Sequence, residues 1–160
     1  MDNSLNIASL LAKYFPESSI SAILGNIDVE TGGTFDYQQQ QENGKGYGLF
    51  QFDSQKEPYF NWLEKSELSD SPESQIRFVA DSIYNDKYDA EGMFTGALDI
   101  GGKSRKAIRK SFDEGSTADI TKTFSQEYER PSKPHMDKRL KSAEDFDKFK
   151  GLFTDPLSFL

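Results

Sequence analysis

The side chain best placed to do chemistry is Glu30, which lies at the end of a predicted amphipathic helix over residues 17–31. The apolar face of this helix repeats at three- and four-residue spacings, at Ile20, Ile23, Leu24 and Ile27. At about 100° per residue, Glu30 lies within roughly 20° of Ile23 on the helical wheel. The pattern therefore places a carboxyl group where another Leu or Ile is expected, and the glycines at 32 and 33 end the helix.

A carboxyl group at that position is suited to acid catalysis. An apolar environment raises the pKa of a carboxyl group, and the negative C-terminal end of the helix raises it further. A carboxylic acid that keeps its proton near neutral pH can protonate a leaving-group oxygen. The alternative is a Glu at the margin of the apolar stripe, exposed to solvent where the helix frays.

A second segment, residues 44–53 with the sequence GKGYGLFQFD, combines glycines with aromatic residues. The glycines permit a tight turn and a close approach of the backbone to a ligand. The apolar and aromatic side chains favour a strand. We therefore expect residues 32–56 to form a small β-hairpin element with a polar, glutamine-rich loop.

Three motifs, taken in this order, resemble the lysozyme superfamily and in particular the phage tail lysozyme family. Leu24 to Glu30 match the family pattern Leu-Gly-Asn-apolar-x-x-Glu, and Gly46 to Gln51 match Gly-aromatic-Gly-Leu-x-Gln. The run at 128–131 matches a Tyr-Glu-Arg-Pro motif near the end of the family's domain. Goose-type lysozymes and lytic transglycosylases carry a comparable Gly-Leu-apolar-Gln element after their catalytic Glu.

This resemblance implies both a fold and an activity. The fold is mainly α (α+β), a two-lobed lysozyme-like arrangement with the β-hairpin element after the catalytic helix. The activity is that of a muramidase, a glycoside hydrolase that cleaves the β-1,4 bond between N-acetylmuramic acid and N-acetylglucosamine, with Glu30 as general acid. Two alternatives stay open: a lytic transglycosylase that gives 1,6-anhydro products, and a non-catalytic cell-wall-binding or structural tail module.

Glycoside hydrolysis by protein groups normally uses two carboxyl groups. Asp36, Glu42 and Asp53 are within reach of Glu30 by sequence, and Asp36 and Asp53 are our candidates for a second carboxylate. For each of them, capping a turn through its side chain is the alternative. In goose-type and transglycosylase relatives a single Glu is often the only obligatory carboxylate, so the resemblance does not require a second one.

The candidate substrate-binding residues of the glycine-rich segment are Tyr47, Gly48, Phe50 and Gln51. The resemblance implies that the Gln51 amide contacts either sugar or Glu30 across the cleft. The two aromatic rings can stack on sugar faces. The alternatives are an outward-facing strand position for Gln51 and core positions for the rings.

The later part of the chain adds one candidate residue, Tyr128, and two pairs of residues that we interpret as structural or surface groups. Tyr128 lies on the apolar face of its predicted helix, and its hydroxyl can reach the cleft. We interpret Glu129 and Arg130 as an ion pair or a cap contact rather than as catalytic groups. Arg105 and Arg109 share one helical face, which predicts a solvated surface, with an anion-contacting patch as the alternative.

The pattern of the whole chain predicts a single lysozyme-like domain over residues 1–160. A helical lobe is expected over about 58–153. Its helices are expected at 59–65, 72–84 and 104–112, from Thr117 to the proline at 131, and at 138–153, after a first helix that ends at Tyr14.

Composition excludes several classes of function. The chain has 160 residues, 35% of them hydrophobic, which suffices for one domain with its own core. A formal net charge of −8 argues against nucleic-acid binding. With no Cys and one His, we expect no metal and no cofactor.

The same features bear on where the protein acts. No transmembrane run and no basic signal-peptide region are visible, so we expect neither membrane insertion nor Sec export. The expected partners are peptidoglycan glycan strands and other phage tail proteins. The expected location is the phage tail or, for an endolysin, the host cytoplasm before lysis. An acidic domain fits delivery to the wall by a larger assembly, because like charge slows its encounter with an anionic wall.

Overall fold

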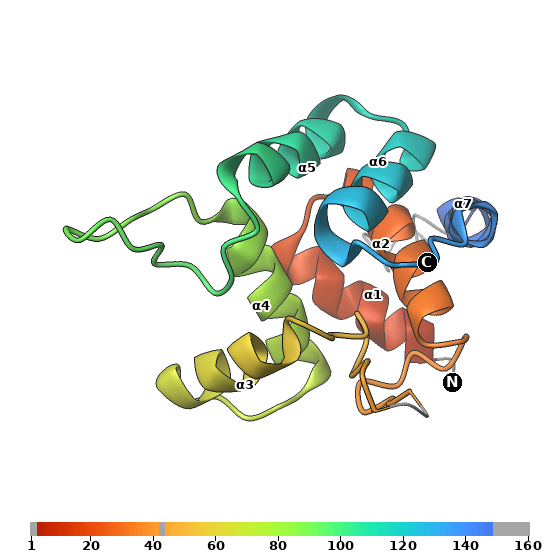
Figure 1. Cartoon of the computed structure of the whole chain (residues 1–160). Coiled ribbons are helices and arrows are strands. Elements are labelled where there is room, and N and C mark those ends of the chain that lie inside the picture. Colours follow the sequence, from red (N-terminus) through yellow and green to blue (C-terminus); the bar gives the residue numbers. More distant parts are fainter. Residues whose placement is uncertain (1–2, 42–43, 149–160) are drawn as a thin grey trace.

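The computed structural model describes residues 3–41 and 44–148. Helices dominate this part of the chain (Figure 1). In order they are α1 (Asn3–Tyr14), α2 (Glu17–Glu30), α3 (Lys56–Lys65), α4 (Pro72–Tyr84), α5 (Gly102–Glu114), α6 (Thr117–Phe124), the π-helical turn η1 (Ser125–Glu129) and α7 (Met136–Asp147). The predicted extension of the last helix beyond residue 148 lies outside the described residues.

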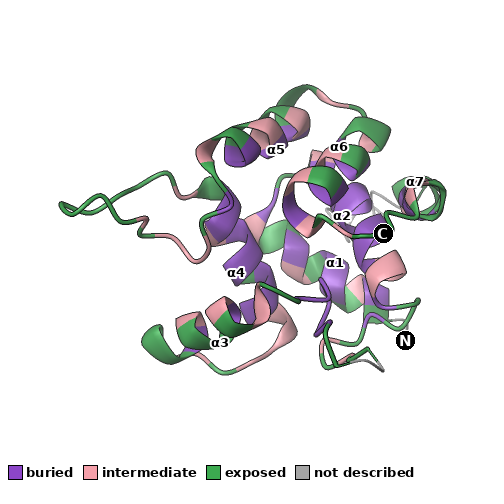
Figure 2. Cartoon of the chain, in the orientation of Figure 1, coloured by how far each residue is buried: buried purple, intermediate pink, exposed green. Residues whose placement is uncertain are grey.

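Helix α2 is the central element of the fold. It packs against α1, α5, α6 and α7, and Figure 2 shows it buried along most of its length. Every residue from Ser19 to Ile27 is buried, so the apolar stripe and also the small polar residues between its members face protein. The first two residues of the helix and its last turn, which ends at Glu30, are in contact with solvent.

A glycine allows α2 and α7 to pack unusually close together. A Cβ atom on Gly25 would lie 2.7 Å from the backbone nitrogen of Ala143 and 2.8 Å from the carbonyl oxygen of Arg139. No side chain fits at those distances, so the two helix backbones are in contact at this point. This close packing brings the first turns of α7 beside the C-terminal end of α2.

The prediction of a β-hairpin within residues 32–56 is wrong. Among the described residues of this segment there are only isolated bridges, from Gln40 to Tyr47 and from Tyr47 to Phe52. Gly48 (φ 82°) and Gln51 (φ 48°) adopt left-handed conformations, so the run that reads as a strand is bent into a turn. Tyr47 and Phe52 close this turn by exchanging two backbone hydrogen bonds of 3.0 and 2.8 Å.

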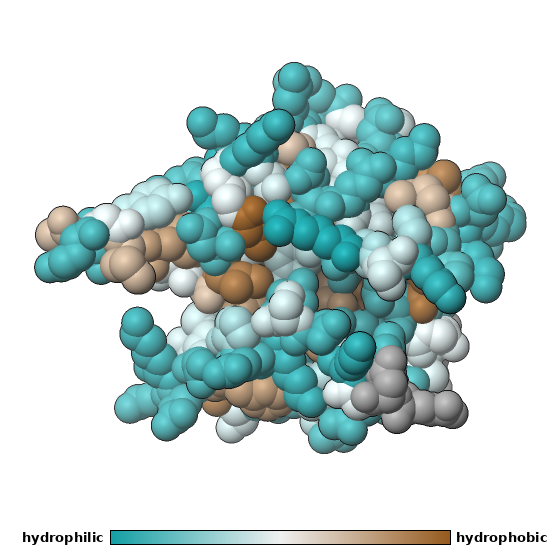
Figure 3. Space-filling model, viewed as in Figure 1, coloured by the Kyte–Doolittle hydropathy of each residue, from teal (hydrophilic) through white to brown (hydrophobic). Residues whose placement is uncertain are grey.

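The arm, residues 85–101 between α4 and α5, projects from the helical body (Figure 1). An isolated bridge joins Tyr88 to Phe94, and their rings lie 5.7 Å apart at their centroids. Met93 near the tip is 64% exposed. In Figure 3 this face of the molecule is largely hydrophilic, with apolar patches along the arm and a hollow between the arm and α3.

Candidate active site

The position of Glu30 at the end of α2 is fixed by the cap of this helix. The next residue, Thr31, caps the helix: its backbone N–H donates to Ile27 and its buried hydroxyl donates to the same carbonyl at 2.8 Å. The Thr31 hydroxyl oxygen also accepts the backbone N–H of Phe35 at 3.0 Å. The last turn of α2 is therefore held in place, and the Glu30 side chain is only 13% exposed rather than frayed into solvent.

A cleft of about 820 Å³ opens in front of Glu30. Its walls come from the end of α2, the loop before α3, the base of the arm, the segment that links η1 to α7, and the start of α7. The lining residues are 29–30, 41, 45–46, 51, 53–55, 98–100, 128–133, 135 and 139. A cavity of this volume is in the range of sites that hold small organic ligands, and its lining here is mostly polar.

Arg139 fixes the Glu30 carboxylate from α7. Its side chain is buried, with 1% exposure, and its Nη2 donates to Glu30 Oε1 at 2.7 Å. Its Nη1 donates to Asn26 Oδ1 at 2.8 Å and its Nε donates to the carbonyl of Pro134 at 2.5 Å. Because three acceptors hold the guanidinium group, it orients the Glu30 carboxyl group rather than following it.

Two opposing effects act on the pKa of Glu30. Burial raises the pKa, while the hydrogen bond and charge of Arg139 and the charge of His135 lower it. Burial dominates, so the pKa lies above the ordinary value of 4.5. A raised pKa is the property that a general acid needs near neutral pH.

Glu129, which we interpreted from the sequence as half of an ion pair, lines the same cleft. Part of the residue reaches the cleft surface, but its Oε1 atom is buried and has no hydrogen-bond partner within the described structure. Burial raises the pKa of Glu129 well above 4.5, the charge of Glu30 raises it further, and Arg139 lowers it. The Tyr-Glu-Arg-Pro motif at 128–131 includes Glu129, but the motif alone does not show that this carboxyl group lies at the cleft.

The structure brings three of the other candidate residues to the cleft, namely Gln51, Asp53 and Tyr128. Gln51 turns inward: its Nε2 donates to the carbonyls of Gln39 at 3.1 Å and Gly48 at 2.8 Å. Its amide donors therefore hold the loop, and its buried Oε1 has no partner among the described residues. Asp53 is exposed at the cleft edge, and Tyr128 is buried, with its hydroxyl beside Ser82.

Asp36, Tyr47, Gly48 and Phe50 are not among the lining residues. Asp36 is exposed, and its Oδ1 accepts the backbone N–H of Gln38 at 2.9 Å, which is the turn-capping arrangement. The Tyr47 hydroxyl donates to Asp70. Glu42 lies outside the described residues.

Phe50 lies in the aromatic core rather than in the cleft. Its ring centroid lies 6.2 Å from that of Phe124 and 6.4 Å from that of Tyr128. Gly48 is needed for a close approach of protein to protein. A Cβ atom there would lie 2.5 Å from Gln75 Oε1, the atom that accepts the backbone N–H of Leu49 at 2.9 Å.

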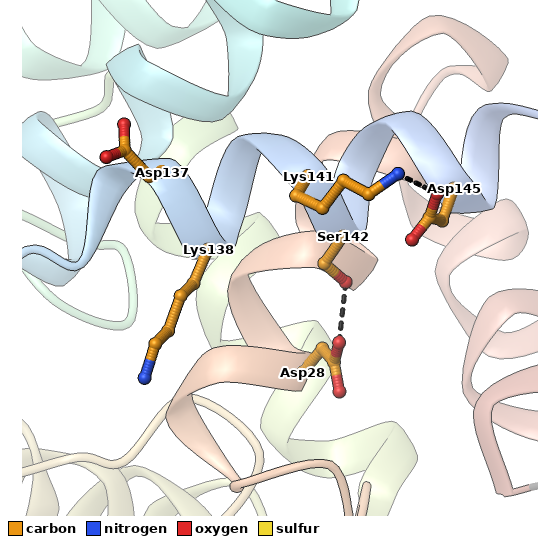
Figure 4. A pocket seen from close by; sticks show the side chains of 6 residues that line it. All are labelled: Asp28, Asp137, Lys138, Lys141, Ser142 and Asp145. Atoms are coloured by element: carbon orange, nitrogen blue, oxygen red, sulfur yellow. Dashed lines mark hydrogen bonds and ion pairs between the residues drawn. The ribbon is translucent and has the colours of Figure 1, made fainter.

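A second hollow of about 360 Å³ lies between α2 and α7, lined by Asp28, Asp137, Lys138, Lys141, Ser142 and Asp145 (Figure 4). Its polar groups pair with one another: Ser142 Oγ donates to Asp28 at 2.6 Å and Lys141 Nζ donates to Asp145 at 3.0 Å. It is shallow, and none of the three aspartates that line it is buried. We therefore place the candidate active site in the larger cleft.

The described residues include no group of three or more His, Cys, Asp or Glu side chains that could hold a metal ion. Within the same part of the chain, no helix has both the length and the apolar character needed to cross a membrane.

Comparison with known proteins gives one family. The family model described as phage tail lysozyme matches residues 5–149. No curated protein and no solved structure matches the chain.

Proposed function

The chain belongs to the phage tail lysozyme family, and from this premise we propose that it is a muramidase that cleaves the β-1,4 bond between N-acetylmuramic acid and N-acetylglucosamine in peptidoglycan. Glu30 is the general acid. The observation that carries this proposal is a carboxyl group with raised pKa, 13% exposed, at the wall of an 820 Å³ cleft. A family name alone would not identify the residue that supplies the proton.

In the proposed reaction Glu30 protonates the bridging oxygen as the glycosidic bond breaks. The carboxylate that forms faces Arg139, which already donates to Glu30 Oε1 at 2.7 Å. Negative charge therefore develops beside a fixed positive group, and this stabilises the transition state more than the ground state. Arg139 in this reading is a positioning residue, since it acts through Glu30.

The cleft supports a polymeric sugar as substrate. Its lining is mostly polar, as hydroxyl and acetamido groups require, and it runs between parts of the chain far apart in sequence. The phage family suggests association with a virion, and we propose that a tail assembly delivers the domain to the wall. The net charge of −8 fits this proposal, because a freely diffusing acidic protein would be repelled by anionic wall polymers.

The decisive experiment is Glu30→Gln, assayed on purified peptidoglycan. The amide keeps an oxygen that accepts from Arg139, so the fold is retained, but it cannot donate a proton as an acid does. We expect activity to fall by about two to four powers of ten. Asp28→Asn is the matched control, because Asp28 lies on the same helix and faces the second hollow.

Mass spectrometry of the digest separates the remaining alternatives. Reducing-end muramic acid is the expected product, and dominant 1,6-anhydro muramic acid would identify a lytic transglycosylase instead. A wild-type protein that binds peptidoglycan but releases no soluble sugar would be a non-catalytic wall-binding module.

A further inference from the structure

The proposed function gives no role to the carboxyl group of Glu129, which is buried at the cleft, whereas Asp53 at the cleft edge is exposed. Glu129 is the last residue of η1, and it lines the cleft together with Glu30 of α2. Turns of π-helix are frequent at functional sites, because the extra residue re-aims side chains. The next residue, Arg130, ends this turn in a left-handed conformation with φ 48°.

A structural carboxylate in this position should have a partner, and Glu129 Oε1 has none within the described structure. The neighbouring Arg130 does not supply one. Its Nε donates to the carbonyl of Glu127 at 3.0 Å, and its Nη2 donates to the carbonyl of Ile100 at 2.8 Å and to Ser104 Oγ at 3.1 Å. Glu129 therefore meets the cleft with part of its side chain, while its Oε1 atom is closed to solvent and is not held by any structural contact among the described residues.

The charges around Glu129 come from two other helices. Glu30 of α2 raises its pKa and Arg139 of α7 lowers it, while His135, at the start of α7, acts on Glu30. The Arg139 guanidinium group thus lowers the pKa of both carboxyl groups, and it hydrogen-bonds to that of Glu30. Because two like charges at one site are disfavoured, the pair holds one proton and titrates as a unit.

We propose that Glu129 is the second catalytic carboxyl group, the base that takes the proton from the attacking water molecule. This inference rests on the proposed function, since it requires Glu30 to be the acid.

The step balances with one proton on the pair. The Glu30 proton moves to the bridging oxygen, which leaves as the 4-hydroxyl of N-acetylglucosamine with the electron pair of the broken C1–O bond. Water oxygen forms the new bond to C1, and one water proton moves to the Glu129 carboxylate. The pair ends with Glu30 ionised beside Arg139 and Glu129 protonated, which is the arrangement that the two pKa shifts favour. The reactive form, with the proton on Glu30 and Glu129 ionised, is therefore the minor one, and it re-forms when solvent takes the proton from Glu129 and returns one to Glu30.

Two consequences follow. A single displacement by water inverts the configuration, so the first product carries an α reducing end. Activity requires one group protonated and the other ionised, so kcat/KM is bell-shaped in pH, with Glu129 on the acidic limb and Glu30 on the alkaline limb.

The test uses Glu129→Gln, Glu30→Gln and the control Glu127→Gln in the full chain, with a soluble glycan of alternating N-acetylglucosamine and N-acetylmuramic acid. Glu127 lies in the same turn and accepts the Ser104 hydroxyl at 2.6 Å, a contact that glutamine can keep. Circular dichroism and urea midpoints establish folding. We expect Glu129→Gln to lower kcat by about 10²- to 10⁴-fold and to abolish the acidic limb, with Glu127→Gln close to wild type.

Proton NMR of the first turnovers should show the α anomer for the wild type. The inference is overturned, and the proposed function kept, if Glu129→Gln retains the acidic limb and more than about a tenth of kcat, a loss too small for a general base. The β anomer as first product would likewise exclude water activated for direct displacement, whereas 1,6-anhydro ends would overturn both this inference and the hydrolase assignment. An active Glu30→Gln protein, or an inactive wild type, would overturn the proposed function and this inference with it.

Discussion

Arg105 and Arg139 are both buried, with 1% exposure each, and both bind carboxylates, yet they belong to different kinds of site. Arg105 of α5 holds the base of the arm, where its Nε donates to Asp86 at 3.1 Å and its Nη1 donates to Asp99 at 2.7 Å. Those two aspartates are about half exposed, at 51% and 47%. Arg139 binds Glu30, whose side chain is 13% exposed, at the cleft.

The carboxyl groups at the two arginines respond in opposite directions. The hydrogen bond from Arg105 is the largest influence on Asp86 and on Asp99, and it lowers the pKa of each. At Arg139, burial is the largest influence, and the pKa of Glu30 and of Glu129 is raised. A buried arginine therefore does not by itself indicate an active site. The solvent exposure of its carboxyl partners determines whether their pKa is raised or lowered.

Among the substitutions at these two sites, we expect Arg139→Met to have the largest effect on stability and activity. Removing the cation leaves Glu30 buried without its partner, together with the acceptors of Asn26 and Pro134. We expect the free energy of unfolding to fall by about 3–5 kcal/mol and activity to be lost. Urea unfolding at neutral pH measures the first.

Adding Glu30→Gln to Arg139→Met should restore part of the lost stability, because the uncompensated charge is gone. Strictly additive effects of the two substitutions would mean that the 2.7 Å contact contributes nothing to stability.

Arg105→Met should have a smaller effect. Asp86 and Asp99 already reach solvent, so each can be rehydrated when the guanidinium group is removed. We expect a loss of about 1–3 kcal/mol from packing and hydrogen bonds. The arm should also become more sensitive to limited proteolysis than in the wild type. Because Asp99 lies in the cleft wall, activity should fall, but by less than in Arg139→Met; an equal or larger fall in a folded Arg105→Met protein would contradict this division between the two sites.

Local patterns predicted the helices well because their signals are local. The apolar spacing ending at Glu30, the start of α4 at Pro72 and the start of α6 at Thr117 all correspond to observed helix faces or starts. The strand-like run at 47–52 failed as a predictor because two residues in left-handed conformations bend it into a turn. Side-chain alternation alone does not report those φ angles.

The candidate site was predictable only in part, for a related reason. Glu30 is identifiable because it breaks a helical pattern, a local signal. Arg139 lies 109 positions away and reaches Glu30 only because Gly25 lets α7 contact α2. Glu129 stands out by lying in the same cleft as Glu30 with a buried carboxyl oxygen that has no described partner, which only tertiary structure reveals. Arg105, interpreted as part of a solvated surface, is buried by the arm in the same way.

The opposite pKa shifts predict opposite pH dependences of stability. The pKa of Glu129 is raised above 4.5, so its favourable contribution is full below that pH and is lost as pH rises through the folded-state pKa. Glu129→Gln should therefore gain stability relative to wild type above pH 4.5 and match it below. The pKa of Asp99 is lowered from 3.8, so its contribution is present above that pH and is lost as pH falls. Asp99→Asn should be less stable at neutral pH and approach wild type in acid.

Urea midpoints measured from pH 3 to pH 8 for both variants test these signs together. If the stability of both variants relative to wild type changed in the same direction with pH, the carboxyl groups at the two arginine sites would not have opposite pKa shifts.

The smallest effect tests how far the active site extends along the contact between α2 and α7. Ser142 lies three residues after Arg139 on α7, and its hydroxyl donates to Asp28 at 2.6 Å in the second hollow. Ser142→Ala removes one hydrogen bond to a carboxylate that solvent can reach, so we expect a loss of about 0.5–1.5 kcal/mol and unchanged kcat. A tenfold or greater fall in kcat, with folding intact, would mean that the α2–α7 contact at Gly25 transmits small shifts to the Glu30 carboxyl group. The active site would then extend through the helix pair rather than ending at the cleft wall.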